Sequence, residues 1–203
     1  MAELKSCLLC GVGGQGTVLA SRLIGLAAME KGLFARTAET IGMAQRGGCV
    51  VSHVRVGASV PSPLIPPGEA DVLLGFEPGE AVRCLGYLKP GGTAIVCSRT
   101  VEPVTATLSG GGYAADPLLT YLRAHTGRLI VLDGAAAAAA SGTEKTLNVA
   151  LLGALARTGA MGLSREELLT ALEAKVAARF LESNRKALQF GYEAAERAMG
   201  VEG

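Results

Sequence analysis

The sequence has no tryptophan, and aromatic residues occupy only 4% of its 203 positions. It also has no run of basic residues, and its formal net charge is +1. Proteins that bind nucleic acids use basic patches to contact phosphates and aromatic side chains to stack on bases. These two shortages argue against nucleic acid as the main partner.

Charged residues are scarce as well. They make up 18% of the chain, whereas apolar residues make up 49% and the mean hydropathy is +0.36. An average globular protein has roughly 25% charged residues. One core of this size cannot easily hide so much apolar surface, so we expect a protein partner to cover part of it.

Long apolar runs are missing too, since no stretch reaches the roughly 18 apolar residues of a membrane helix. The N-terminus lacks the basic and then apolar layout of a secretory signal peptide. The five cysteines, an odd number without regular spacing, indicate reduced thiols. We therefore expect a cytoplasmic protein without membrane contact. No repeat or linker divides the chain, which predicts a single domain over residues 1–203.

Two of the cysteines, Cys7 and Cys10, form a C-x-x-C pair. They lie in an apolar run of strand length, where an odd separation places side chains on opposite faces. Two thiols on opposite faces cannot bind one metal ion together. The sequence therefore predicts no metal site in this chain.

A glycine-rich turn follows that run. Gly11, Gly13 and Gly16 match the pattern G-x-G-x-x-G, and a long apolar-patterned segment begins at Thr17. Such a unit of strand, turn and helix binds the phosphates of a dinucleotide or only permits close packing of helix on strand. A dinucleotide site also needs an acidic residue about 20 residues further on. The candidate, Glu39, comes 28 residues after Gly11, and both readings stay open.

Strand-like and helix-like segments share the first two thirds of the chain, and no further strand is evident after residue 132. We expect strands over residues 4–10, 33–39, 49–56, 71–76, 93–97 and 129–132. We expect helices over residues 15–31, 78–88, 116–125, 147–155 and 180–199, and another that begins at a capping box at residues 164–167. The fold class is therefore α/β, with a Rossmann-like, mostly parallel sheet, helices on both faces and a helical C-terminal segment.

Few residues are suited to catalysis. The only two histidines are His53, on the expected strand 49–56, and His125, at the end of an expected helix. The face of the strand that carries His53 and Arg55 is expected to meet solvent, ligand or partner. No nucleophile elbow, zinc-binding helix or Walker lysine occurs. The chain thus shows no catalytic set of its own.

Arg46 stands between Gln45 and the glycines Gly47 and Gly48. A guanidinium in such a loop binds a carboxylate or phosphate, or it pairs with a carbonyl or with a carboxylate of a partner. The sequence does not choose between these roles.

The glycine motifs 13–16 and 42–48, followed by Val-Ser-His-Val-Arg at 51–55, resemble the gamma-type domain of the 2-oxoacid:ferredoxin oxidoreductases. The resemblance continues through residues 62–66, 69–71 and 88–92, through Asn148 with residues 152–154, and through Asn184 with residues 191–193, so it covers nearly the whole chain. Within that family, the Ser-Pro-Leu-Ile-Pro segment most resembles the beta subunits of the indolepyruvate-type members. Cys49 departs from the small residue expected there.

The resemblance implies oxidative decarboxylation of a 2-oxo acid to an acyl-coenzyme A, CO2 and reduced ferredoxin. It places thiamine diphosphate, magnesium and the iron–sulfur clusters in a large partner subunit and no cofactor in this chain. Coenzyme A is the co-substrate, and ferredoxin is reached through the complex. It also implies that the following residues contact ligand or partner: Gly13, Gly14, Gln15, Gly16, Met43, Gln45, Arg46, Gly47, Gly48 and Asn148.

Two alternatives remain. One is a stand-alone oxidoreductase that binds a nicotinamide or flavin nucleotide through Gly11, Gly13, Gly16 and Glu39. The other is an architectural subunit without a ligand of its own.

Overall fold

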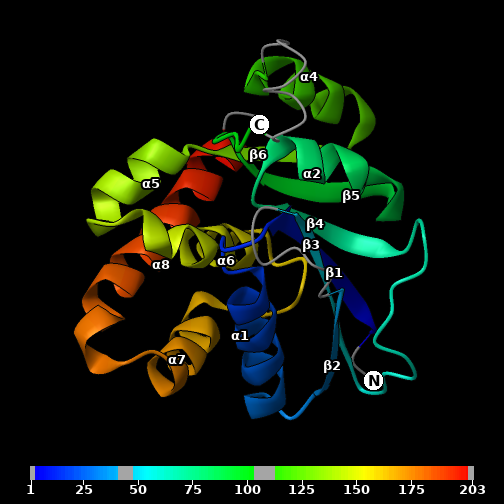
Figure 1. The fold of residues 1–203 in the computed structure, drawn as a ribbon. Coiled ribbons are helices and arrows are strands. Elements are labelled where there is room, and N and C mark those ends of the chain that lie inside the picture. The colour runs from blue at the N-terminus through cyan, green and yellow to red at the C-terminus, as the bar shows by residue number, and fades with distance from the viewer. Residues whose placement is uncertain (1–2, 41–47, 103–112, 201–203) are drawn as a thin grey trace.

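The computed structural model describes residues 3–40, 48–102 and 113–200. Figure 1 shows the chain, in which all six strands lie before residue 133 and the last third is helical. In chain order they are β1 (Lys5–Val12), α1 (Thr17–Glu30), β2 (Phe34–Thr40), β3 (Cys49–Gly57), β4 (Ala70–Gly75), α2 (Pro78–Arg83), η2 (Leu85–Tyr87), β5 (Leu88–Cys97), α4 (Ala115–His125), β6 (Arg128–Leu132), α5 (Gly134–Ser141), η3 (Glu144–Thr146), α6 (Leu147–Thr158), α7 (Arg165–Lys175) and α8 (Ala178–Gly200).

The strands form one six-stranded sheet in the order β2-β3-β1-β4-β5-β6. β1, β4, β5 and β6 are parallel neighbours. β3 is antiparallel to both β1 and β2, so β2 runs in the direction of β1. The expected α/β fold with a mostly parallel sheet is confirmed.

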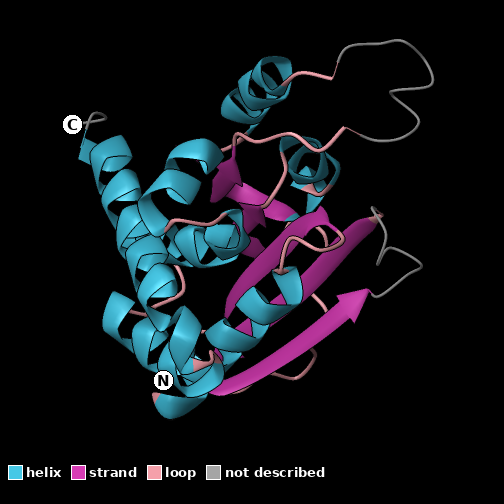
Figure 2. Cartoon of the chain, turned by 60° about the vertical axis from the view of Figure 1, so that its left-hand side comes forward, coloured by secondary structure: helices cyan, strands magenta, loops and turns pink. Residues whose placement is uncertain are grey.

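Helices cover both faces of the sheet, as predicted. One face packs on α1, α5, α6, α7 and α8, which gather on the same side in Figures 1 and 2. The other face packs on α2, α4 and the connector between β3 and β4. Successive residues of β1 alternate between the two cores, so Cys7 lies in one and Cys10 in the other. The opposite orientation predicted for this pair is confirmed.

The apolar segment 147–155 is the buried helix α6, as expected. Its cover is α8 of the same chain, and two glycines allow the backbones to touch. A Cβ on Gly153 would lie 2.0 Å from the carbonyl oxygen of Leu188, and one on Gly191 would lie 1.7 Å from that of Ala150. No larger residue fits at either position without moving a helix.

α8 is the longest helix, with 23 residues, and it buries only one side: Asn184, Ala187, Leu188, Gly191 and Ala195. The three- and four-residue spacing of these positions is that of an amphipathic helix. Within residues 3–40, 48–102 and 113–200, no helix combines the length and apolar character that a membrane crossing requires.

Several helix boundaries follow from local side-chain bonds. The predicted capping box at Ser164 and Glu167 is present, with Ser164 Oγ accepting from the Glu167 amide. The alanine-rich segment forms α5, because Asp133 Oδ1 accepts from the amides of Ala135 and Ala136.

Two predicted boundaries were wrong. The helix expected over 78–88 ends at Arg83 and continues as the 3₁₀ turn η2. The strand expected over 93–97 begins earlier, because β5 starts at Leu88 and includes residues 89–92. It pairs with Ala70 at Leu88 and resumes opposite Val72 at Thr93. An irregularity within one strand thus has the composition of a loop.

Candidate functional site

The candidate site lies at the edge of the sheet where the parallel strands end. β1 and β4 are neighbours there, but the helices that follow them cover opposite faces. α1 follows β1 on one face, and α2 follows β4 on the other. Open α/β sheets bind ligands at such a switch point, because the diverging connections leave a crevice between them.

The glycine turn after β1 forms one wall of this crevice. Gly16 has φ +83° and is the N-cap of α1, whose first turn has no side-chain cap. A side chain at this φ is strained, and a Cβ here would lie only 2.7 Å from Asn148 Nδ2. The positive end of α1 therefore meets the crevice through bare backbone.

Gln15, a predicted contact residue, binds within the chain. Its Oε1 accepts from the Val12 amide at 2.7 Å, and its Nε2 donates to the Phe76 carbonyl at 3.2 Å. Val12 ends β1 and Phe76 directly follows β4. The Gln15 side chain thus joins the two strand ends across the switch point and fixes the shape of the turn.

Asn148 of α6 lies directly against this glycine turn. It is 3% exposed at the start of α6, and its Nδ2 donates to the Gly16 carbonyl at 3.4 Å. The structure therefore brings Asn148 against the glycine turn although 132 residues separate Asn148 from Gly16 in the chain.

A cavity of about 510 Å³ opens beside this contact. It is lined by Gly14, Gln15, Gly16, Leu19, Arg99, Val101, Glu144, Lys145, Leu147 and Asn148. A second cavity of about 530 Å³ shares Leu19, Lys145 and Asn148 with the first and extends toward the start of α8. Together they form a groove along the carboxyl edge of the sheet.

Three charged side chains line the groove, those of Arg99, Glu144 and Lys145. Arg99 Nη1 pairs with Glu144 Oε2 at 2.7 Å, and Lys145 is exposed beside them. Neither Arg99 nor Lys145 was singled out from the sequence. Arg99 does follow an expected strand at the edge where ligands bind, which was an available signal, but nothing local marks Lys145.

Exposed apolar side chains stand around the groove. Leu19 is 37% exposed, Val101 is 37% exposed and Phe180 is 49% exposed. All three line one or both cavities. Large apolar side chains gathered around a cleft are typical of a surface that meets another molecule.

The second glycine motif ends beside the first. The Gly13 amide donates to the Gly48 carbonyl at 3.0 Å, so β3 begins next to the glycine turn. The other predicted contact residues of this motif, Met43, Gln45, Arg46 and Gly47, lie outside the described residues. The two glycine motifs are therefore adjacent at Gly48.

Glu39, the acidic residue of the dinucleotide alternative, lies away from the groove. Its carboxylate accepts from Ser21 Oγ of α1 at 3.2 Å, and it does not line either cavity of the groove. The position does not supply the ribose contact that a dinucleotide-binding turn requires.

The interpretation of the strand face around His53 and Arg55 needs correction, because both residues are buried. His53 Nδ1 accepts from the Ile65 amide at 3.2 Å, and Arg55 Nη1 donates to the Leu64 carbonyl at 3.1 Å. Burial lowers the pKa of His53. The two side chains therefore hold the proline-rich connector of the same chain onto the sheet.

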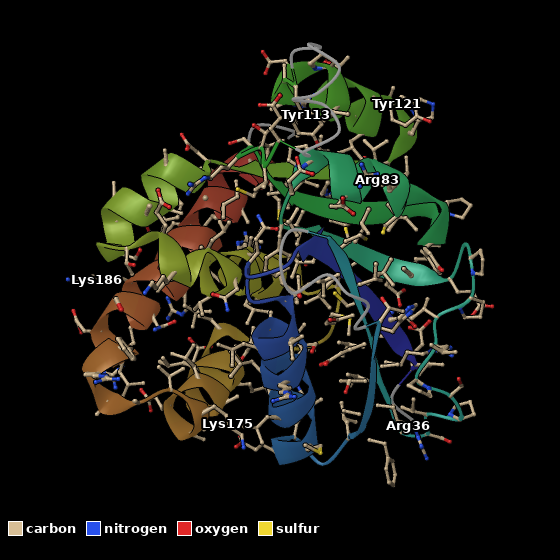
Figure 3. The ribbon with its side chains drawn as sticks, in the orientation of Figure 1. Arg36, Arg83, Tyr113, Tyr121, Lys175 and Lys186 are labelled. Atoms are coloured by element: carbon tan, nitrogen blue, oxygen red, sulfur yellow. The ribbon has the colours of Figure 1, made fainter. Side chains whose placement is uncertain are left out.

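A buried acidic cluster lies across the switch point. Glu77, the N-cap of α2, accepts from the Glu80 amide at 2.9 Å and from the hydroxyl of Tyr113 at 2.7 Å. Burial and this carboxylate raise the pKa of Tyr113. Glu80 pairs with the exposed Arg83, and Figure 3 labels Tyr113 and Arg83. This cluster was not predicted from the sequence, although an acidic residue directly before Pro78 has the pattern of a helix cap.

No group of three or more histidine, cysteine, aspartate or glutamate residues is placed to hold a metal ion in the described part of the chain. An iron–sulfur cluster needs about four convergent thiolates. Cys7 and Cys10 lie on opposite faces of the sheet, so this donor set does not fit such a cluster.

Comparisons with known proteins agree on one family. The model of the pyruvate ferredoxin/flavodoxin oxidoreductase family matches residues 6–194. Indolepyruvate oxidoreductase subunit IorB of Thermococcus kodakarensis is 35% identical over 199 residues, with 96% of this chain and 97% of that protein covered. The protein of the same name from Archaeoglobus fulgidus is 38% identical over 183 residues, with 90% of each chain covered.

Solved structures share the fold. The gamma subunit of keto/oxoacid ferredoxin oxidoreductase from Geobacter sulfurreducens has a TM-score of 0.71 at 25% identity, with 96% of this chain and 99% of that chain covered. The 2-oxoglutarate:ferredoxin oxidoreductase of Magnetococcus marinus has a TM-score of 0.72 at 20% identity, and the match covers 96% of this chain but 31% of that one. The chain described here belongs to the pyruvate ferredoxin/flavodoxin oxidoreductase family.

Proposed function

We propose that this chain is the subunit without cofactors of a thiamine-dependent 2-oxoacid:ferredoxin oxidoreductase, with an arylpyruvate such as indolepyruvate as substrate. The complex would convert the 2-oxo acid to an acyl-coenzyme A and CO2 and pass two electrons to ferredoxin. Residues 1–203 would form one gamma-type domain in the cytoplasm. Relatives named indolepyruvate oxidoreductase subunit IorB, at 35–38% identity, support the choice of substrate class.

The groove at the carboxyl edge is the observation that carries this proposal. It unites the glycine turn with Asn148, and exposed apolar side chains stand around it. The lining of the first cavity includes no histidine, cysteine, serine or threonine, and its only carboxylate, that of Glu144, pairs with Arg99. Such a surface is suited to positioning a partner and its substrate.

The cofactors would belong to the large partner subunit. The described cysteines do not fit an iron–sulfur cluster, and the described carboxylates do not converge on a magnesium site. Thiamine diphosphate would supply the carbanion chemistry of decarboxylation when bound in the partner. This chain's part is to shape one side of the site and exclude water there.

Coenzyme A is the ligand that this chain's own residues fit best. Lys145 and the uncapped start of α1 put positive charge at the groove, which suits an anionic portion of the coenzyme. Gln45 and Arg46 are proposed to contact the same anionic portion or the partner. Gly47 and Gly48 would permit the close backbone approach.

Reconstitution tests the proposal. The purified chain alone is expected not to oxidise any 2-oxo acid with a viologen acceptor. After co-expression with the large thiamine-binding partner, the complex should oxidise arylpyruvates in preference to pyruvate and 2-oxoglutarate. Turnover by the lone, partner-free chain, or equal activity of the partner without it, would contradict the proposal.

A titration separates the dinucleotide alternative. We expect no tight binding of NAD or FAD to the chain, because Glu39 is bound to Ser21 away from the groove. A calorimetric dissociation constant on the order of 1 μM, about −8 kcal/mol, would favour a stand-alone nucleotide-dependent enzyme.

A further inference from the structure

The outer edge of β2 (residues 34–40) is open in the described part of the chain. β2 is the last strand on its side of the sheet, so alternate amides and carbonyls along it have no neighbouring strand to bond. The three most exposed large apolar side chains among the described residues stand around this strand. Phe34 of β2 is 66% exposed, Leu64 of the connector after β3 is 56% exposed, and Met29 of α1 is 55% exposed.

Two cations lie beside this edge on the face that α1 covers. A cavity of about 270 Å³ brings the side chains of Ala35 and Thr37 together with Arg22 of α1 and Lys175 at the end of α7. A Cβ on Gly25 of α1 would lie 3.8 Å from both Ala35 Cβ and Thr37 Cγ2, so the odd-numbered residues of β2 face α1. Arg22 and Lys175 are exposed, and neither side chain forms an ion pair with any described residue.

A third cation, Arg36, lies on the opposite face of β2. It stands directly across from Arg55 of β3, and like charges in this arrangement repel each other. Arg55 Nη2 lies 3.7 Å from a Glu69 carboxylate oxygen, while its Nε is buried without a hydrogen-bond partner. The Arg36 side chain has no ion pair with a described residue. Two guanidiniums thus face one carboxylate here, and negative charge is in deficit.

The open strand edge and the unpaired cations require one kind of occupant. An extended segment bonds a sheet edge through its backbone, and its successive side chains point to alternate faces. Acidic residues on one face would meet Arg36, and acidic residues on the other would meet Arg22 and Lys175. Figure 3 labels Arg36 and Lys175. Each such contact would be a charge-assisted hydrogen bond.

A second copy of this chain does not meet these requirements. Glu39 is the only acidic residue of β2, and its carboxylate accepts from Ser21 of the same chain. Antiparallel copies related by a twofold axis normal to the sheet keep every residue on its own face. Glu39 shares the face of Thr37, so Arg36 of either copy would meet no carboxylate of the other strand. A charge on an edge strand of this kind discourages pairing between identical strands.

We propose that the outer edge of β2 is a docking site for an extended, acidic segment of the large partner subunit, which adds a strand to the sheet. This inference rests on the function proposed above, because that function supplies the partner. β2 runs in the direction of β1 and ends at Thr40, so it leads to the carboxyl edge that also bears the groove. The docked strand would extend the contact surface from the groove along the side of the sheet.

Hydrogen–deuterium exchange tests this docking site on the lone chain and on the co-expressed complex. Amides of residues 34–40 should exchange at least tenfold more slowly in the complex, because those that point outward gain a partner strand. A complex in which these amides exchange as fast as in the lone chain would overturn the docking site and leave the proposed function intact. Failure of wild type to form any complex would contradict both. Slow exchange in a lone chain of dimeric mass would assign the edge to a second copy instead.

Charge reversal tests the acidic character of the segment. Arg36→Glu and Lys175→Glu should each raise the dissociation constant of the complex at least tenfold at low salt, and added salt should narrow the difference from wild type. Arg123→Glu is the matched control, because Arg123 is exposed on α4 and also forms no ion pair with a described residue. It should bind like wild type. Equal dissociation constants for Arg36→Glu and Arg123→Glu would overturn the proposal.

Discussion

Asn148 Nδ2 donates to the carbonyl oxygen of Gly16, and a Cβ on Gly16 would lie 2.7 Å from that same nitrogen. The buried side-chain amide of Asn148 therefore fills the space that a side chain at position 16 would need. This contact joins the C-terminal helices to the glycine turn, and both residues line the groove. Their energetic coupling is open to direct measurement.

Gly16→Ala should cost roughly 1–2 kcal/mol for its left-handed backbone alone, and more because of the clash with Asn148. Asn148→Ala should cost about 1–3 kcal/mol through the lost buried bond. In the double variant the clash is absent. Its loss of unfolding free energy should therefore be smaller than the sum of the two single losses by about 0.5–3 kcal/mol. Urea unfolding of all four proteins gives the coupling, and additive losses would refute the shared contact.

Gly191→Ala should be among the most destabilising single substitutions in α8. The added Cβ would lie 1.7 Å from the Ala150 carbonyl oxygen, so α8 must move off α6. Overpacking of this kind costs about 3 kcal/mol or more. Gly200→Ala, in the same helix with nothing within 4 Å of the added Cβ, is the matched control and should change stability by less than about 1 kcal/mol. Similar unfolding midpoints for the two variants would contradict the backbone contact.

His53 should make stability depend on pH. Burial lowers its pKa in the folded chain, so the unfolded chain binds a proton more readily. The free energy of unfolding should be at its full value above the unfolded pKa of about 6.5, fall as the pH drops below it, and level off beneath the folded pKa. Protonation of Nδ1 also removes the bond from the Ile65 amide.

The His53→Asn variant tests that assignment, since an amide oxygen can accept from Ile65 without titrating. It should remove much of the slope in unfolding free energy between about pH 7 and pH 5. An unchanged slope in chemical denaturation would assign the pH dependence to other groups.

Arg46→Ala should weaken partner affinity or turnover of the reconstituted complex by about 1–3 kcal/mol through loss of a charge-assisted contact. Arg46→Lys should recover only part, because lysine lacks the planar fork of a guanidinium. Arg123→Ala is the control, since Arg123 is an exposed residue of α4. Equal affinity and turnover for Arg46→Ala and wild type would leave Arg46 an ordinary loop residue.

Local patterns predicted much of this fold, because many of its strands and helices are long and are bounded by glycine, proline or capping residues. β1, α1 and the capping box of α7 lie within a few residues of their expected positions. The antiparallel course of β3 depends on pairing with β1 across the chain, which no local period encodes. The burial of His53 also depends on a tertiary contact, because the segment that covers it, the connector around Ile65, lies outside its own strand.

The candidate site was predicted only in part. The glycine spacing indicated Gly16, and the family resemblance indicated Asn148. Their contact joins residues 132 positions apart, so it depends on the tertiary fold and could not be predicted from either motif. Arg99 and Lys145 come from segments with no distinctive motif, so their place in the groove depends on how β5 and η3 end. Such residues can be recognised as part of a site only once the folded chain brings their segments together.

Because β3 returns antiparallel between β2 and β1, the segment joining Thr40 to Gly48 leaves and re-enters the sheet at the carboxyl edge. A change of sequence in a connection between adjacent antiparallel strands need not displace a helix or alter the strand order. Substitutions in the motif at residues 42–48 should therefore change contacts with a ligand or partner while the cores on both sides of the sheet stay the same.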